Sequence, residues 1–150
     1  MSGLFLFVYD KTKMLHETVG GPPHVTVAYT GKHVSWTGLV TCANGLWLRF
    51  MRSPGPVQLV LGRAERSSFQ RADGTWRHDV LLMVQNTAEI DAYRETLKGM
   101  FPGVHDKFAM LPPHVTAATC DTAEAAAAAL ARFEKCLPLT VDVTGVYLDS

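Results

Sequence analysis

The chain has 150 residues, 47% of them hydrophobic, and its 14 lysine and arginine side chains balance 14 aspartates and glutamates. This length fits one domain with a sizeable core, and the neutral balance lacks the global positive charge that long nucleic-acid tracts require. No stretch is long enough to span a membrane, and the apolar run near the N-terminus lacks the features of a signal peptide. Three cysteines without metal-ligand spacing are typical of reduced thiols. We therefore expect a single cytoplasmic domain, residues 1–150, whose partner is a small or short phosphate ester.

The predicted elements alternate between strands and helices, with glycine- and proline-rich segments between them. In chain order they are strands Gly3–Tyr9 and His24–Tyr29, a helix ending near Met51, strands Val57–Phe69 and Arg77–Val84, a helix from about Asn86 to Met100, a strand opening at His114, an alanine-rich helix to about Cys136, and a strand Leu139–Leu148. Ala72-Asp73-Gly74 predicts a tight hairpin turn between two of these strands, because glycine accepts positive φ. The pattern favours an α+β protein made of two related halves.

Two of these helices carry residues that are typical of N-terminal caps. Asn86 is followed three residues later by Glu89, and Asp121 is followed three residues later by Glu124. Such pairs can hydrogen-bond the free N–H groups of a first helical turn. We therefore expect Asn86 and Asp121 to begin the second and third helices.

The tetrapeptide Pro-His-Val-Thr occurs twice, at residues 23–26 and 113–116, and a second proline precedes each copy. Composition alone predicts far fewer than one copy in a chain of this length. In an extended strand alternate side chains face the same way, so the histidine and threonine of each copy share one face. The same alternation predicts that Ala28 and Ala118 lie on that face as well. Two such strands can present two imidazoles and two hydroxyls to one site.

The chemistry of these four side chains suits a phosphodiester. Cleavage requires one proton to be removed from the attacking oxygen and another to be given to the leaving oxygen, and two imidazoles can hold one neutral and one protonated form near neutral pH. Threonine hydroxyls can donate hydrogen bonds to the non-bridging oxygens. We expect His24 and His114 to transfer protons and Thr26 and Thr116 to bind phosphate, without a metal ion or other cofactor.

The paired H-x-T motifs, each opening a strand in one of two similar halves, resemble those of the 2H phosphoesterases, which include the 2′-5′ RNA ligase-like proteins and the 2′,3′-cyclic phosphodiesterases. The resemblance implies that His24 and His114 are the acid and base pair and that Thr26 and Thr116 bind phosphate. It also implies a two-lobed fold, with antiparallel-rich sheets around a central cleft and helices outside. Known members act on RNA ends with a 2′,3′-cyclic phosphate or on 2′-5′ and 3′-5′ oligonucleotide linkages, both of which stay open for this chain.

Other residues near the motifs are candidates for substrate contact, although each has an ordinary alternative as surface or core. Lys32 and Lys107 can supply positive charge, and Trp36 and Phe108 can stack on a base. No arginine lies near either motif in the sequence. The substrate is therefore expected to be a nucleotide or short RNA, bound by a monomer with no obligate protein partner.

Three alternative site chemistries can be weighed on the same residues. Zinc is disfavoured because no carboxylate or cysteine stands at ligand spacing from the motif histidines, and threonine is a poor zinc ligand. Strand alternation puts Cys120 on the face of His114, but six residues and roughly 20 Å further along the strand, too far to act as an activated thiol. A non-catalytic RNA- or nucleotide-binding module on the same fold is the remaining alternative to an enzyme.

Overall fold

The computed structural model describes residues 3–15, 22–29, 35–51, 57–100 and 111–149. The strands are β1 (Gly3–Tyr9), β2 (His24–Tyr29), β3 (Gln58–Gln70), β4 (Trp76–Val84), β5 (His114–Cys120) and β6 (Leu139–Asp149), and the helices are α2 (Trp36–Phe50), α3 (Ala88–Met100) and α4 (Ala123–Glu134). The α+β class and the order of the elements are as predicted, and the predicted ends coincide with the observed ones or differ by one or two residues. The hairpin between β3 and β4 is also confirmed, since Gly74 has a φ of 88°.

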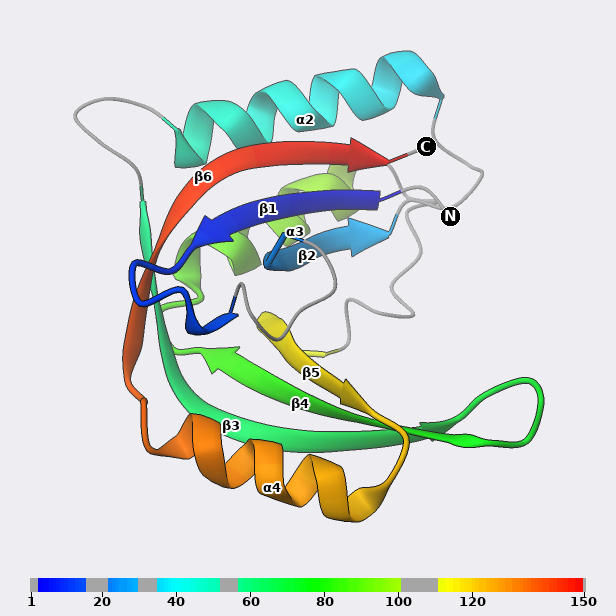
Figure 1. Ribbon diagram of the computed structural model, residues 1–150. Helices are drawn as coiled ribbons and strands as arrows, with labels where there is room; N and C mark the ends of the chain where they lie inside the picture. The colour runs from blue at the N-terminus through cyan, green and yellow to red at the C-terminus, as the bar shows by residue number, and fades with distance from the viewer. Residues whose placement is uncertain (1–2, 16–21, 30–34, 52–56, 101–110, 150) are drawn as a thin grey trace.

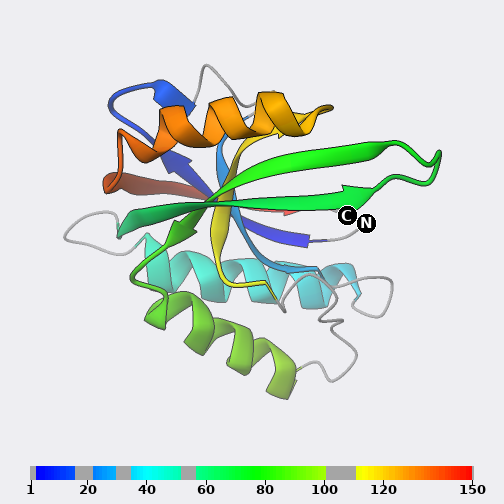
Figure 2. The ribbon, with the colours of Figure 1, turned by 90° about the horizontal axis from the view of Figure 1, so that it is seen from below.

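The strands form a closed antiparallel barrel in the order β1-β2-β5-β4-β3-β6. Helix α2 packs against β6, α3 against β2, and α4 against β3, β4 and β5. Figure 1 shows α2 and α4 at opposite ends of the molecule with the strands between them. Figure 2 shows α4 on the opposite side of the strands from α2 and α3. The helices therefore cover the outer face of the strands and leave the inner face to other residues, in agreement with the predicted architecture.

Residue alternation along β1 separates the two faces of the sheet. Leu4 and Leu6 are fully buried and belong to the hydrophobic core under the helices, whereas Phe5 and Phe7 alternate with them and face inward. The helices complete this core with apolar residues at a spacing of three or four, as an amphipathic helix requires. In α2 these are Leu39, Cys42, Leu46 and Phe50.

The two halves of the barrel repeat the same strand pairing. Phe7 of β1 is paired with His24 of β2, and Met83 of β4 is paired in the same way with His114 of β5. The outer strands repeat as well, since β6 pairs with β1 as β3 pairs with β4. An approximate twofold relation therefore connects β1 with β4, β2 with β5, and β3 with β6.

Each motif strand contains a bulge directly after its threonine. Val27 in β2 and Ala117 in β5 are the extra residues opposite the neighbouring strand, so the strand alternation is shifted by one residue beyond them. Ala28 and Ala118 consequently pair with core residues and lie on the outer face. The prediction that they share a face with the motif histidines is wrong, because a regular alternation cannot reveal a bulge.

The predicted capping residues make other contacts. Asn86 accepts a hydrogen bond from the Val60 backbone N–H at 2.8 Å and donates one to the Gln58 carbonyl, so it joins β3 to the start of α3 instead of capping the helix. Asp121 forms an ion pair with Arg71. The N-cap of α4 is the next residue, Thr122, whose hydroxyl accepts from the Ala125 N–H at 3.1 Å.

Helices α2 and α3 meet at a buried tyrosine. The Tyr93 hydroxyl of α3 donates a hydrogen bond to the Cys42 carbonyl of α2. A Cβ at Gly45 would lie 2.9 Å from the Tyr93 hydroxyl oxygen, so glycine permits this close approach in the middle of α2. Burial raises the pKa of Tyr93 to about 12.

We expect Tyr93→Phe to lower the free energy of unfolding at pH 7 by about 1–2 kcal/mol, because a buried acceptor loses its donor. Because the pKa of Tyr93 is raised in the folded state, the stabilisation that its protonated hydroxyl contributes is fully present below pH 10 and is lost as the pH rises toward 12. The difference in free energy of unfolding between wild type and variant should therefore be about 1 kcal/mol smaller at pH 11 than at pH 7. Urea unfolding at both pH values measures this, and an unchanged difference would contradict it.

Candidate active site

The two motifs lie on neighbouring antiparallel strands. Val25 of β2 is paired with Val115 of β5, and both valines are buried in the core. Extending this antiparallel register by one residue in each direction places His24 opposite Thr116 and Thr26 opposite His114. All four side chains share the inner face, because they alternate with the valines. The two histidines are thus diagonal neighbours, about 7–8 Å apart at their Cα atoms in regular sheet geometry.

The proline before each Pro-His pair holds one nitrogen of the imidazole. Nδ1 of His24 lies 3.2 Å from the Pro22 carbonyl oxygen, and Nδ1 of His114 lies 2.8 Å from the Pro112 carbonyl oxygen. A carbonyl oxygen can only accept, so Nδ1 carries the proton in both rings and the neutral tautomer leaves Nε2 as an acceptor. Because a residue before proline is held in extended conformation, the double proline fixes the direction of this carbonyl.

The second proline of each pair anchors the approach to the motif strand. The Pro23 carbonyl accepts from the Val8 N–H at 3.0 Å, and the Pro113 carbonyl accepts from the Val84 N–H at the same distance. Proline lacks an N–H, but only its carbonyl is needed here. The duplicated Pro-Pro-His-Val-Thr segments therefore present two imidazoles in equivalent, backbone-fixed positions.

Both motif threonines are half-buried on the inner face. Within the described part of the chain, neither hydroxyl makes a hydrogen bond with protein, and the same holds for Nε2 of both histidines. Four polar groups on adjacent positions of one sheet face are thus available to a ligand.

Arg94 on α3 supports the first motif and its bulge. Its guanidinium donates to the carbonyls of Thr26 and Val27, each at 2.9 Å, and to the Leu111 carbonyl at 3.1 Å. Leu111 stands immediately before the double proline of the second motif. One side chain therefore ties the end of the first motif to the approach of the second, although it lies nearly seventy residues beyond the first motif.

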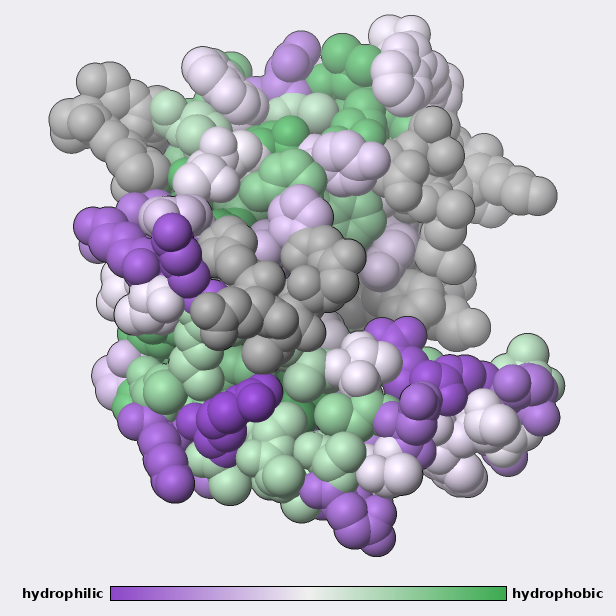
Figure 3. Space-filling model, in the orientation of Figure 1, coloured by the Kyte–Doolittle hydropathy of each residue, from purple (hydrophilic) through white to green (hydrophobic). Residues whose placement is uncertain are grey.

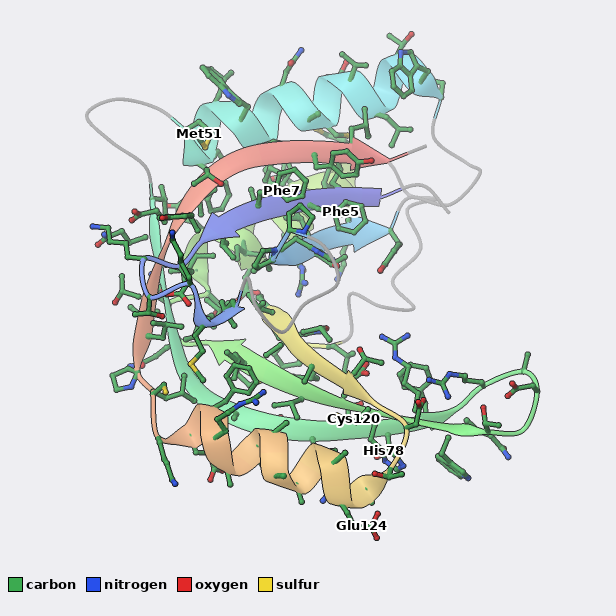
Figure 4. The ribbon with its side chains drawn as sticks, in the orientation of Figure 1. Phe5, Phe7, Met51, His78, Cys120 and Glu124 are labelled. Atoms are coloured by element: carbon green, nitrogen blue, oxygen red, sulfur yellow. The ribbon has the colours of Figure 1, made fainter. Side chains whose placement is uncertain are left out.

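Aromatic rings surround His24 on the inner face. The Phe5 ring meets the His24 ring edge-on with centroids 5.3 Å apart, and it also contacts Tyr29 and Tyr147. The Phe7 ring stacks on Tyr147 with centroids 5.2 Å apart. Figure 4 shows Phe5 and Phe7 along β1. We call Phe5, Phe7, Tyr29 and Tyr147 the aromatic wall.

A different set of residues occupies the other side of the site. Arg63 of β3 is paired with Met83, and Glu65 is paired with Leu81, so both charged residues share the inner face with His114. Arg63 Nε donates to a Glu65 carboxylate oxygen at 2.8 Å. We call Arg63, Glu65, Leu81 and Met83 the charged wall.

Arg63, Arg94 and the aromatic wall were not predicted from the sequence. The two arginines are distant from the motifs along the chain, and only strand register and helix packing bring them near. The aromatic residues of β1 had a detectable signal, because Phe5, Phe7 and Tyr9 alternate with core residues in the first strand. Reading that alternation as a second, functional face would have found them.

The remaining predicted substrate contacts have a mixed outcome. Lys32, Lys107 and Phe108 lie outside the described residues. Trp36 is the first residue of α2, in the outer layer, and is 61% exposed, so its contact with substrate stays a prediction.

Cys120 lies on the opposite face of the sheet from His114. Beyond the Ala117 bulge it pairs with His78 and packs against the core on the α4 side, as Figure 4 also shows. The predicted alternation put its thiol on the face of His114, and this is wrong for the same reason as for Ala118. The thiol and the motif imidazole lie on opposite faces of the sheet.

No group of three or more histidine, cysteine, aspartate or glutamate side chains in the described ranges could hold a metal ion. No helix among those residues is long and apolar enough to cross a membrane.

Comparison with known protein families agrees with the fold and the duplicated motifs. Residues 15–149 match the 2′-5′ RNA ligase superfamily, and the chain therefore belongs to this family of 2H phosphoesterases. The family as a whole catalyses phosphoester reactions, either ligation or phosphodiester cleavage. No curated protein matches the chain.

We expect Arg94→Met to lower the free energy of unfolding by about 2–4 kcal/mol, because three backbone carbonyls lose a charged donor. Arg94→Lys should cost less, since an ammonium can still reach one or two of these oxygens. Arg132→Met is the matched control: Arg132 is an exposed helical arginine whose contact is with the neighbouring Phe133 ring, and its loss should cost less than about 1 kcal/mol. Equal losses for Arg94→Met and Arg132→Met in urea unfolding would disprove the anchoring role.

Proposed function

We propose that this protein is a metal-independent phosphodiesterase that hydrolyses a nucleotide or short RNA phosphodiester by acid and base catalysis from His24 and His114. The supporting observation is the diagonal placement of two imidazoles on one sheet face, each held at Nδ1 by a proline carbonyl. The expected substrates are a 2′,3′-cyclic phosphate or a cyclic or linear oligonucleotide signal with 2′-5′ or 3′-5′ linkages.

The approximate twofold relation of the site suits the geometry of the reaction. In phosphoryl transfer the attacking and leaving oxygens lie roughly in line on opposite sides of phosphorus. A base is needed on one side and an acid on the other. Two twofold-related imidazoles approach a phosphorus atom between them from opposite sides, so each can serve one of these oxygens.

The fixed tautomers give both histidines the same proton-transfer atom. The unprotonated Nε2 of one ring takes a proton from water as the water oxygen bonds to phosphorus. The protonated Nε2 of the other ring gives its proton to the ribose oxygen as the phosphorus–oxygen bond to that oxygen breaks. Neither step disturbs the Nδ1 hydrogen bond to the proline carbonyl, so the rings keep their orientation throughout.

Thr26 and Thr116 complete the site by binding the non-bridging oxygens. Each hydroxyl lies opposite the histidine of the other motif and has no hydrogen bond within the described residues. A hydroxyl that donates to a non-bridging oxygen is worth most when that oxygen gains negative charge in the transition state.

We expect His24→Ala and His114→Ala each to lower kcat by about 10²–10⁴-fold, because each removes one proton-transfer group. His78→Ala is the control, since His78 is hydrogen-bonded to Ser68 and is paired with Cys120 on the outer face of the sheet. The assay is chromatography of products from nucleoside 2′,3′-cyclic phosphates, 2′-5′ oligoadenylate and cyclic dinucleotides, with and without chelator. Unchanged turnover in both motif variants, or loss of wild-type turnover in chelator, would refute the mechanism. Tight binding with no product would indicate the non-catalytic alternative.

The rate should depend on pH with a bell shape. One imidazole must be neutral and the other protonated in the same enzyme molecule, so activity falls when both are protonated and when both are neutral. We expect kcat/KM for the preferred substrate to decline on both sides of a maximum, and His24→Gln or His114→Gln to abolish one limb in the residual activity. A profile flat from pH 5 to pH 9 would count against paired proton transfer.

A further inference from the structure

The two walls of the site break the twofold relation that the motifs obey. Strand pairing makes Phe5 equivalent to Leu81, because each is paired with a motif threonine. On the outer strands, Tyr147 is paired with Phe5, whereas the equivalent partner of Leu81 is Glu65. One side of the site therefore presents rings where the other side presents aliphatic and charged groups.

A second pair of positions continues this difference. Phe7 and Met83 are equivalent, since each is paired with a motif histidine. The neighbour of Phe7 on β6 is Gly145, and the neighbour of Met83 on β3 is Arg63. Among the described residues, Gly145 places no side chain beside the Phe7 ring, while the Arg63 side chain is 67% exposed. Figure 3 shows hydrophobic atoms over β1 and hydrophilic atoms along the β3–β4 hairpin.

We propose that the aromatic wall binds the nucleobase of the substrate, with Phe7 and Tyr147 as the stacking rings, and that this fixes which way the substrate enters the nearly symmetric site. The inference rests on the proposed phosphodiesterase function, because a base is the part of a nucleotide that stacks on an aromatic face. Tyr147 is 44% exposed and Phe7 is half-buried, so both offer ring surface while remaining held by mutual stacking.

The position of the wall supports a nucleobase over other occupants. The aromatic wall adjoins the histidine and threonine of the first motif directly, with Phe5 in contact with the His24 ring. A base joined through ribose to a phosphate at the motifs would reach a wall one to two strands away, roughly 5–10 Å at the spacing of sheet strands. The charged wall offers a guanidinium and a carboxylate, which suit phosphate oxygens and ribose hydroxyls.

The orientation that follows assigns different neighbours to the two histidines. His24 lies on the side of the phosphorus nearer the base, and His114 lies on the side nearer Arg63 and Glu65. A substrate in the reverse orientation would place its base on a charged ion pair and leave the aromatic rings facing water. Stacking of a base on aromatic side chains is worth a factor of about 5–150 in affinity.

The test is equilibrium binding by calorimetry, which does not require turnover. The two ligands are adenosine 2′-phosphate and methyl riboside 2-phosphate, which carries a methyl group in place of the base. We expect the wild type to bind the nucleotide about 5–150-fold more tightly than the base-free ligand. Phe7→Leu and Tyr147→Leu should remove most of this difference in affinity without weakening the binding of the base-free ligand. Arg63→Met should weaken the binding of both ligands by the same factor.

Two further variants separate stacking from general damage. Trp76→Leu removes an exposed ring beside the β3–β4 hairpin and should leave both affinities unchanged. Gly145→Leu keeps every ring but covers Phe7, and a Cβ at this position would make an ordinary 3.8 Å contact with that ring. Gly145→Leu should weaken the binding of the nucleotide but not of the base-free ligand, while Gly145→Ala should have little effect on either affinity.

Equal wild-type affinity for the two ligands, or equal weakening of both by Tyr147→Leu and Gly145→Leu, would overturn the stacking site. The substrate panel run on the same wild-type protein distinguishes this failure from failure of the proposed function. Cleavage without base-dependent binding would refute only the aromatic wall, and base-dependent binding without cleavage would refute only the phosphodiesterase.

Discussion

The antiparallel pairing of Val25 with Val115 is the constraint on which the site depends. It places the two Pro-His-Val-Thr segments side by side with their polar residues on one face and their valines in the core. A slip of one residue in either strand would turn an imidazole and a hydroxyl toward the helices, where no ligand could reach them. The buried valines make such a slip costly, so hydrophobic burial on one face fixes the chemistry on the other.

The barrel combines a nearly symmetric reaction centre with asymmetric surroundings. Equivalent strands supply the histidines, threonines, proline carbonyls and bulges, which suits an in-line displacement that also has two similar sides. The walls that flank this centre come from β1 and β6 on one side and from β4 and β3 on the other. Rings on the first side and charges on the second allow a substrate with unlike ends to bind in one direction.

Arg94 shows how the outer layer supports the inner one. The bulge at Val27 interrupts the regular pairing of β2 beside β1, and the guanidinium of α3 binds the carbonyls of Thr26 and Val27 at that point. The same side chain reaches the segment that leads into β5. Residues on rigid strands that are held by hydrogen bonds from the outer helical layer can keep a reactive geometry that a mobile loop could not.

The strands and helices, the duplicated motif and, through it, the family can be read from the sequence alone, because alternation and a repeated tetrapeptide are local signals. Expectations that assumed unbroken local rules were wrong: the Val27 and Ala117 bulges turned Ala28, Ala118 and Cys120 to the outer face, and Asn86 joined β3 instead of capping α3. The positions of Arg63, Arg94 and Tyr147 near the motifs became visible only in the folded chain. Their positions follow from long-range strand register and helix packing, and a single sequence carries no local trace of either.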